Sequence, residues 1–440
     1  MAHGRQCLAD TPVFSKLFRL SDATLPDASN AHAMTPRERH AAFSLSSIYA
    51  LRMLGLFMVL PVFMIEARHY EGGQDASAVG LAMGLYGLVQ ALLQIPFGMA
   101  ADRWGRKRVI YLGLALLALG SLLGALATSV TQLAWARALQ GGGAISAAVT
   151  ALLADQTRDE VRTKGMALIG GSIGLMFALS LLLGPVLSGW GGLGAIFGTT
   201  FCLSLCGIAM VRWWTPPEAP LSEKPASSHG LGALLVHPDL VRLNIGVFVL
   251  YAVQLASWVA IPALLVQAGV ASENHGYVYL PAVLLSFVVM GLSLFPLERR
   301  GLLKPLFLAC IALVLVVQLA WAWMAWQGSP SMAWLAVWLF LFFCGFNVLE
   351  ASQPSLASRL APTGARGAAL GVYNTLQSLG IFAGGAAGGW LVKQLGAHSV
   401  FMASALLMLI WWAAAWGGRY VKSTPSPHGA AHQSASNQAA

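Results

Sequence analysis

Residues 98–108 read Gly98-Met-Ala-Ala-Asp102-Arg103-Trp-Gly105-Arg106-Lys107-Arg108, and this charged segment separates two long uncharged runs of the chain. It contains one carboxylate, four cations and two glycines. Because apolar residues flank it, the segment predicts a tight turn between two membrane-spanning helices, with its cations on one side of a bilayer. A loop that only sets topology needs lysine and arginine, but it does not need an aspartate placed at a fixed distance after a glycine.

The composition excludes a water-soluble globular protein. Charged residues make up 10% of the 440-residue chain, against about 25% in ordinary soluble domains, and 57% of the residues are hydrophobic. The mean hydropathy is +0.68. The strands of a membrane barrel would alternate polar with apolar residues, whereas these uncharged runs are continuous and long enough to span about 30 Å of hydrocarbon. We therefore predict an all-α membrane protein.

About twelve membrane-spanning helices can be placed along the chain. They are expected at roughly 43–66, 77–101, 109–128, 131–154, 165–187, 190–212, 240–267, 276–297, 305–326, 332–357, 366–392 and 396–418. Between them, the Pro, Ser, Glu and Lys residues of 213–239 predict a linker between two six-helix halves. The sequence that follows the fourth span, Thr163-Lys-Gly-Met-Ala-Leu168, is echoed after the tenth by Ala365-Arg-Gly-Ala-Ala-Leu370, as a duplicated unit predicts.

This pattern predicts five parts of the chain. They are a disordered N-terminal tail at 1–42, a six-helix half at 43–212, a linker at 213–239, a second six-helix half at 240–418 and a disordered tail at 419–440. Met34 is an alternative start of the chain, because Met34-Thr-Pro-Arg leads directly into the first span. Mass spectrometry of the native N-terminus would decide between the two starts.

The distribution of the 26 Lys and Arg residues predicts the orientation in the membrane. If both termini are cytoplasmic, only Arg68 and Lys393 lie on the outer side, and Arg52 and Arg137 lie within spans. All the others then face the cytoplasm, as the positive-inside rule requires. The formal charge of +9 thus reflects topology and attraction to anionic lipid, and it needs no nucleic-acid partner.

Several motifs resemble the major facilitator superfamily of secondary transporters. The segment 98–108 is similar to that family's signature loop between helices 2 and 3, and Arg137-Ala-Leu-Gln140-Gly-Gly-Gly143 is similar to its fourth-helix motif. Other segments resemble the YajR subgroup of bacterial drug/proton antiporter-like transporters, namely Leu51-Arg52-Met-Leu-Gly55, Gln94-Ile-Pro-Phe-Gly98 and Phe346-Asn347-x-x-Glu350-Ala351. The resemblance covers about residues 34–418, although members of the subgroup can carry a soluble domain where this chain has a short tail from Arg419.

The resemblance implies the major facilitator fold and a monomeric, multi-pass protein of the bacterial cytoplasmic membrane. Its partners would be a small-molecule substrate, protons and the lipid bilayer. The Gly184-Pro185 pair in the fifth span resembles a motif of exporter branches, which favours proton-coupled export by alternating access. Uptake or facilitated passage of a sugar-like metabolite and a passive channel or non-transporting sensor remain as alternatives.

The segment 98–108 is expected to act as a gating loop. In the predicted topology the eleventh helix begins in the same layer as Asp102, so the positive end of its dipole would attract that carboxylate. Asp102 would thereby latch the two halves together on the cytoplasmic side. The resemblance adds Arg106 and Asp155 to the same charge-linked cluster, which would hold an outward-open state.

Three ionisable residues within spans are candidates for proton coupling. Glu350 and Arg52 have similar predicted depths in opposite halves; burial favours a neutral carboxyl group, and an approaching guanidinium favours its ionised form. Movement of the halves could then load or release a proton, although a permanent structural ion pair is an alternative. The resemblance links Arg137 to proton transfer, and a structural anchor is the other interpretation of this arginine.

A substrate cavity is expected between the halves, lined in the family by helices 1, 4, 7 and 10. These spans supply Gln140, Tyr251, Gln254, Trp258 and Asn347, and the three from the seventh span share one helix face. Aromatic residues with few charges suit amphipathic or lipophilic solutes. An interfacial aromatic belt or ordinary helix packing is the alternative for each of them.

Nothing in the sequence predicts an enzyme. The ten histidines lie mostly in tails and loops without His-x-x-x-His spacing, and the five cysteines form no ligand pattern. We therefore expect no catalytic residues, no cofactor and no bound metal.

Overall fold

A computed structural model describes residues 33–218, 238–328, 330–361 and 366–418. The regular elements of these residues are helical. In the first half they are α2 (Pro36–Met58), α3 (Phe63–Glu66), η1 (Ala67–His69), α4 (Ala76–Trp104), α5 (Arg106–Ala125), α6 (Val130–Gly141), α7 (Ser146–Asp155) and α8 (Asp159–Trp213). In the second half they are α10 (Pro238–Gln267), η2 (Ser272–Asn274), α11 (His275–Arg299), α12 (Leu303–Gln327), α13 (Met332–Leu360), α14 (Arg366–Leu395) and α15 (Ala397–Trp416).

These helices make twelve membrane spans, which confirms the predicted fold class. In the described part of the chain, nine helices are long and apolar enough to cross a membrane. One of them, α8, supplies two spans, because its backbone bends at Gly191 and Gly192, where Gly192 has a φ of +60°. The remaining spans are α6 together with α7, and α14.

The fourth span is broken, although the sequence analysis predicts one continuous helix over 131–154. The helix α6 ends at Gly141 and α7 begins at Ser146, so residues 142–145 are not helical. Gly141 lies against the backbone of Tyr86 and Gln90 on α4, where an added Cβ atom would collide. The run of glycines therefore has two effects: it weakens the helix at this point, and it allows α6 to approach α4 closely.

The first helix begins well before the predicted start at residue 43. Thr35 and Glu38 form a capping box, in which the Glu38 backbone N–H donates to Thr35 Oγ1 at 3.2 Å. The Thr35 N–H donates in return to Glu38 Oε2 at 2.8 Å. The predicted tail over 1–42 is therefore too long at its end, and residues 1–32 and 419–440 lie outside the described residues. The predicted linker lies between the end of α8 and the start of α10, with residues 219–237 outside the description.

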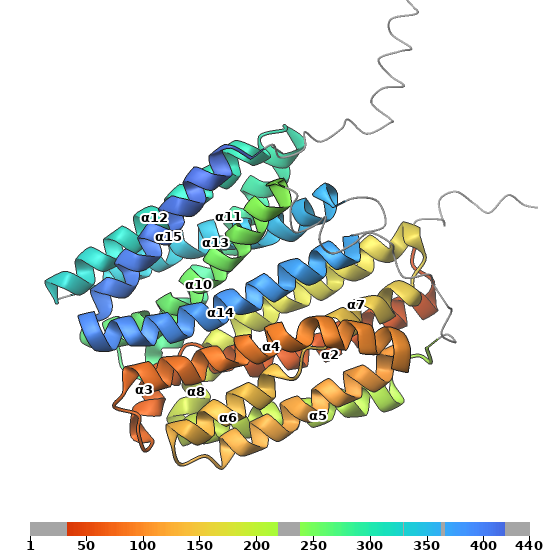
Figure 1. The fold of residues 1–440 in the computed structure, drawn as a ribbon, viewed down its shortest axis with the longest axis horizontal. Coiled ribbons are helices and arrows are strands. Elements are labelled where there is room, and N and C mark those ends of the chain that lie inside the picture. Colours follow the sequence, from red (N-terminus) through yellow and green to blue (C-terminus); the bar gives the residue numbers. More distant parts are fainter. Residues whose placement is uncertain (1–32, 219–237, 329, 362–365, 419–440) are drawn as a thin grey trace, which may run out of the picture.

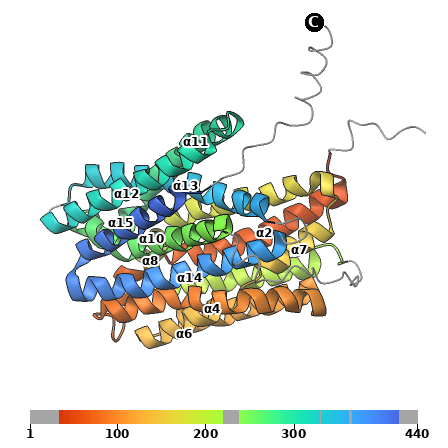
Figure 2. The same cartoon turned by 45° about the horizontal axis from the view of Figure 1, so that its top comes forward.

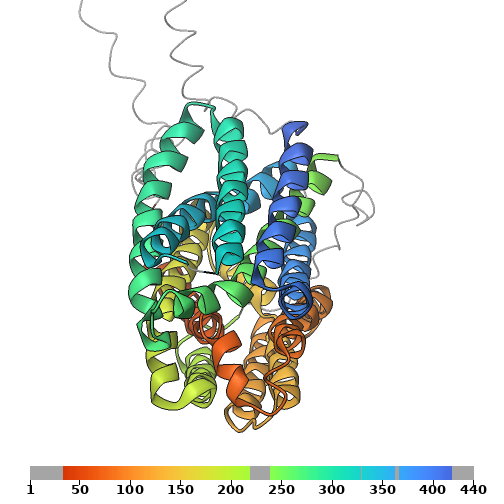
Figure 3. The same cartoon turned by 90° about the vertical axis from the view of Figure 1, so that its left-hand side faces the viewer.

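The two halves lie side by side and meet mainly through α4 and α14 (Figures 1 and 2). We call the end of the bundle that carries the α4–α5 turn the loop end, and the opposite end, with α3 and η1, the far end. Viewed from the far end, the helices of the first half occupy the lower part of the molecule and those of the second half the upper part (Figure 3).

Glycines bring the halves into backbone contact toward the far end. A Cβ atom added to Gly80 on α4 would lie 2.5 Å from the carbonyl oxygen of Gly385 on α14 and 2.6 Å from Gly389 Cα. Such small residues allow two helices in lipid to pack closely. Toward the loop end, by contrast, a Cβ atom added to Gly171 or Gly371 would meet no described atom within 4 Å. The close glycine contacts between the halves therefore lie away from the loop end.

An ion pair also joins the halves at the far end. Asp75 caps the N-terminus of α4, accepting from the Ser77 N–H at 2.9 Å, and its carboxylate lies 2.7 Å from Lys393 Nζ near the end of α14. The Lys393 ammonium holds the pKa of the Asp75 carboxyl below its usual value. Because both side chains are about half exposed, the pair adds little to stability.

Candidate functional site: a charged loop and two buried polar clusters

The charged segment turns between α4 and α5, as predicted from the sequence. The turn is made at Gly105, whose φ of +99° lies in the region that favours glycine. Arg103 and Arg108 are exposed beside it, and Lys107 is partly buried. A Cβ atom added to Gly98, the first residue of the segment, would lie 3.9 Å from the Ala147 side chain, its one neighbour within 4 Å among the described residues.

The structure brings together three residues of the predicted gating cluster, namely Asp102, Arg106 and Asp155. Arg106 forms ion pairs with Asp102, one helical turn before it, and with Asp155 at the end of α7, where Nε and Oδ2 are 3.4 Å apart. The Asp102 side chain is 67% exposed, and Arg106 is its ion-pair partner among the described residues. The attraction between Asp102 and the first turn of α14 remains a prediction.

A third carboxylate, from Glu218, contacts the loop and was not predicted. The N-terminus of α5 has no side-chain cap of its own, and the Lys107 backbone N–H donates to Glu218 Oε2 at 3.1 Å. Glu218 thus serves as the cap, at the end where the helix dipole favours a negative charge. Lys107 Nζ also donates to the Thr215 carbonyl oxygen at 2.8 Å. No local signal could reveal this contact, because Glu218 is far from the loop in sequence.

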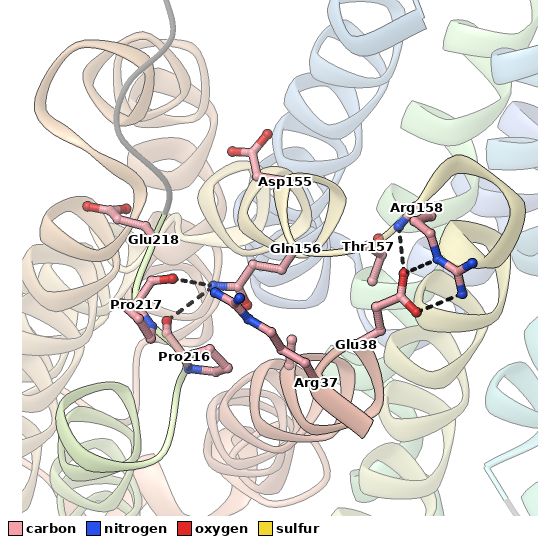
Figure 4. Close-up of a pocket in the computed structure, with 10 residues that line it drawn as sticks. Arg37, Glu38, Asp155, Gln156, Thr157, Arg158, Pro216, Pro217 and Glu218 are labelled. Atoms are coloured by element: carbon pink, nitrogen blue, oxygen red, sulfur yellow. Dashed lines mark hydrogen bonds and ion pairs between the residues drawn. The ribbon is translucent and has the colours of Figure 1, made fainter. Parts of the chain in front are cut away.

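The segment after α8 also closes one side of a pocket at the loop end. The pocket has a volume of about 590 Å³ and is lined by Arg37, Glu38, Ala41, Asp155, Gln156, Thr157, Arg158, Pro216, Pro217 and Glu218 (Figure 4). Gln156 Nε2 donates to the carbonyl oxygens of Pro216 and Pro217 at 3.1 and 3.3 Å. On the opposite wall, Arg158 Nε lies 2.8 Å from Glu38 Oε1. These contacts tie the α7–α8 turn to α2 and to the first part of the predicted linker.

Glu218→Ala is expected to lower the stability of the protein, because it leaves the first turn of α5 without its cap. Loss of a capping side chain costs about 0.5–2 kcal/mol. Thermal unfolding of the purified variant would measure the loss, with Glu71→Ala at an exposed position as the matched control. Glu218→Gln keeps a hydrogen-bond acceptor, so its melting temperature should lie between those of Glu218→Ala and the unmodified protein. Equal melting temperatures for all of these proteins would contradict the capping role.

A buried polar cluster lies within the first half. Arg52 on α2 and Arg137 on α6 are each 2% exposed, and both contact Tyr86 on α4. Arg52 Nη2 donates to the Tyr86 hydroxyl at 3.3 Å, and Arg137 Cζ lies 4.8 Å from the centre of the Tyr86 ring. Arg137 Nη1 also donates to Gln140 Oε1 at 2.8 Å, and Gln140 Nε2 donates to Ser121 Oγ at 2.9 Å. Gln140, expected in the substrate cavity, is thus fully buried between α5 and α6.

A second polar cluster lies within the other half, and it is buried except for Glu350, which is partly exposed. The Tyr251 hydroxyl on α10 donates to Glu350 Oε1 on α13 at 2.7 Å, and Asn347 Nδ2 donates to Ser286 Oγ on α11 at 2.8 Å. Glu350 and Arg52 belong to different clusters and form no ion pair with each other in the described structure. Their approach during a conformational change remains a prediction.

The other predicted residues pack between helices. Gln254 and Trp258 line a space of about 10 Å³ inside the second half, and the Trp258 ring lies edge-on to Tyr279, with centroids 5.1 Å apart. Gly184 lies where α8 crosses α2, and an added Cβ atom would be 2.5 Å from the Met58 carbonyl oxygen. The next residue, Pro185, is inside α8. A role of Gly184 and Pro185 in export and a role of Gln254 and Trp258 in binding remain predictions.

Comparison with known proteins identifies the family. The model of the Major Facilitator Superfamily matches residues 43–385. The inner membrane transport protein YajR of Escherichia coli is 40% identical over 385 residues, which cover 87% of this chain and 84% of YajR. The multidrug resistance protein MdtH of Aeromonas salmonicida is 27% identical, over 78% of this chain and 85% of that protein.

Among solved structures, a D-xylose–proton symporter has the same fold, with a TM-score of 0.72 at 13% sequence identity, covering 87% of this chain and 99% of the symporter. A second, the nucleoside transporter NupG, has a TM-score of 0.70 at 14% identity, covering 86% of this chain and 99% of NupG. At these identities the likeness shows the fold alone. The family match and the identity to YajR show that this chain belongs to the major facilitator superfamily of membrane transporters.

Proposed function

We propose that this protein is a proton-coupled exporter of small amphipathic or lipophilic solutes that works by alternating access. It would act as a monomer in the bacterial inner membrane, with both termini and the loop end facing the cytoplasm. Two relatives support membrane location and export by their names, one an inner membrane transport protein and the other a multidrug resistance protein. Gly184 and Pro185, where α8 crosses α2, support export through their resemblance to the exporter motif.

The observation that carries the proposal is the placement of ionisable groups deep in both halves. Glu350 lies in the second half, where it accepts a hydrogen bond from Tyr251, and the buried Arg52 and Arg137 lie in the first half. Burial away from water favours the neutral form of a carboxyl group, and a nearby guanidinium favours its ionised form. If movement of the halves changes the distance between Glu350 and Arg52, it changes the proton occupancy of Glu350. Conformation and proton binding would then be coupled.

Transport into sealed vesicles tests the proposal. Everted membrane vesicles that contain the protein would be given a panel of amphipathic fluorescent solutes, with and without an imposed gradient that is acid inside. The proposal predicts gradient-dependent accumulation of at least one solute, absent from vesicles without the protein. Equal entry with and without the gradient would instead support a facilitator or a channel.

Gly80→Ala is expected to slow transport, because its methyl group would push α4 away from the Gly385 backbone and weaken closure at the far end. Overpacking of this kind costs about 1–3 kcal/mol. The matched control is Gly171→Ala, where an added Cβ atom meets no described atom within 4 Å. Thiol labelling of a cysteine placed at the buried Val79, in a background without other cysteines, would report the opening. Indistinguishable transport and labelling in the two variants would contradict the role of this contact.

A further inference from the structure

The buried arginines of the first half have no negatively charged partner among the residues that the structure describes. Among the described residues, neither the Arg52 nor the Arg137 guanidinium forms an ion pair, although both side chains are 2% exposed. A buried charge is costly unless it is paired and hydrogen-bonded. The Tyr86 ring compensates Arg137 in part by a cation–π contact, but it supplies no charge.

Several donor groups of these arginines are also unused. The Nε atoms of Arg52 and Arg137 are both buried and have no hydrogen-bond partner in the described structure. Arg52 Nη1 has only the Met53 thioether sulfur, at 3.9 Å, which is a weak acceptor. Arg52 therefore makes one hydrogen bond to oxygen, with Tyr86, although its guanidinium carries five N–H donors. These buried donors are therefore available to an additional acceptor.

The carboxylate of the second half does not balance the positive charge of the two buried arginines. Deep within the described spans, the one carboxylate is that of Glu350, which is bonded to Tyr251. If Glu350 were ionised and paired with Arg52 in another conformation, Arg137 would still lack a counter-ion. If Glu350 were protonated, both arginines would lack one. In either protonation state the spans therefore contain at least one cation more than they contain carboxylates.

We infer that the transported solute carries an oxyanion, such as a carboxylate, which binds between Arg52 and Arg137 beside Tyr86. This inference rests on the proposed transport function and specifies the substrate as an amphipathic organic anion. A planar carboxylate can accept two parallel hydrogen bonds from a guanidinium, which suits the unused donors of Arg52. One bound monoanion together with an ionised Glu350 would bring the charge deep within the spans to zero.

The position of Tyr86 links this site to the movement of the halves. The next residue, Gly87, packs against the backbone of α14, where an added Cβ atom would lie 2.5 Å from the Ser378 carbonyl oxygen and 2.8 Å from the Phe382 backbone nitrogen. An anion beside Tyr86 would thus bind next to the main contact between the two halves. Separation of α4 from α14 would open this region to solvent.

A binding experiment with matched neutral compounds tests the inference. Purified protein would be titrated with a panel of straight-chain and aromatic carboxylates and with the corresponding carboxamides, which have nearly the same shape but no charge. Melting temperature and calorimetric affinity would be the readouts. We expect carboxylates to raise the melting temperature and the carboxamides not to do so. In Arg52→Gln the carboxylate affinity should fall at least about tenfold. Arg52→Lys keeps the charge but loses the planar guanidinium, so its carboxylate affinity should lie between those of Arg52→Gln and the unmodified protein.

Lys304→Gln is the control for the loss of a single positive charge, because Lys304 lies outside the buried clusters, in the first turn of α12. It should bind carboxylates as the unmodified protein does. The inference is overturned if no carboxylate in the panel stabilises the protein, if the carboxamides stabilise it equally, or if Arg52→Gln binds carboxylates unchanged. If Arg52→Gln does not fold, the comparison of carboxylates with carboxamides on the unmodified protein still tests whether the protein binds an anion. Because no gradient is applied, carboxylate binding without gradient-driven transport would reject proton coupling while leaving the anion site standing.

Discussion

Asp102→Asn is expected to abolish transport while leaving expression and folding intact. In the described structure Asp102 is 67% exposed and pairs with Arg106, so the loss of its charge removes a surface interaction of small energy. The large effect is expected in the other conformation, where Asp102 would meet the positive end of the α14 dipole and latch the halves at the loop end. That attraction is worth about 0.3–1 kcal/mol at an exposed site and more when it is partly buried.

Transport into proteoliposomes, measured beside the melting temperature, checks this prediction. The matched control is Glu298→Gln, which removes an acid at the corresponding end of the second half, where Glu298 pairs with Arg359. That variant should retain transport, because the second half lacks the aspartate of the signature loop. Labelling of a cysteine near the loop end should rise in Asp102→Asn, as the population shifts toward the inward-open state. Transport at the unmodified rate by Asp102→Asn would reject the latch.

Glu350→Gln is expected to eliminate gradient-driven accumulation while substrate binding and downhill exchange remain. The glutamine side chain keeps an oxygen that can accept from the Tyr251 hydroxyl, so the local packing should survive. What it loses is the ability to gain and release a proton. Accumulation with an imposed gradient and counterflow without one would be measured on the same vesicles.

The expected pattern for Glu350→Gln is normal counterflow without accumulation. Asn347→Ala is a useful comparison, because Asn347 lies on the same helix and bonds to Ser286 without a titratable group. Accumulation by Asn347→Ala should still depend on the proton gradient, even if its transport rate is lower. If proton-dependent accumulation persists unchanged in Glu350→Gln, the coupling site lies elsewhere, and Arg137 with its neighbours would be examined next.

The fold could be predicted from the sequence because its main signals are local. Continuous apolar runs mark the spans, and the charged segment with Gly105 marks the turn between α4 and α5. Two predictions were wrong, the start of the first helix and the continuity of the fourth span, because local capping and helix-breaking residues decide both. The capping box at Thr35 and Glu38 extends the first helix, and the glycines at 141–143 break the fourth span, which hydropathy alone treats as continuous.

The candidate site was less accessible to sequence reasoning, because its contacts join distant parts of the chain. The depths of Arg52 and Glu350 could be inferred from span boundaries, but the pairing of Arg52 with Tyr86 and of Glu350 with Tyr251 could not. Glu218, which caps α5, gave no signal, since an acidic residue in a linker has no distinguishing pattern. The unused Nε–H donors of the buried Arg52 and Arg137 likewise emerged only from the packing around them.

The most direct test of the proposed mechanism is solute accumulation in everted vesicles under an artificial pH gradient, acid inside, with no other energy source. The proposed mechanism predicts that a transported solute accumulates above its external concentration, and that a protonophore abolishes the accumulation. Vesicles that contain Glu350→Gln should equilibrate the solute without accumulating it. An internal concentration that never exceeds the external one, whether or not the gradient is present, would contradict proton-coupled export.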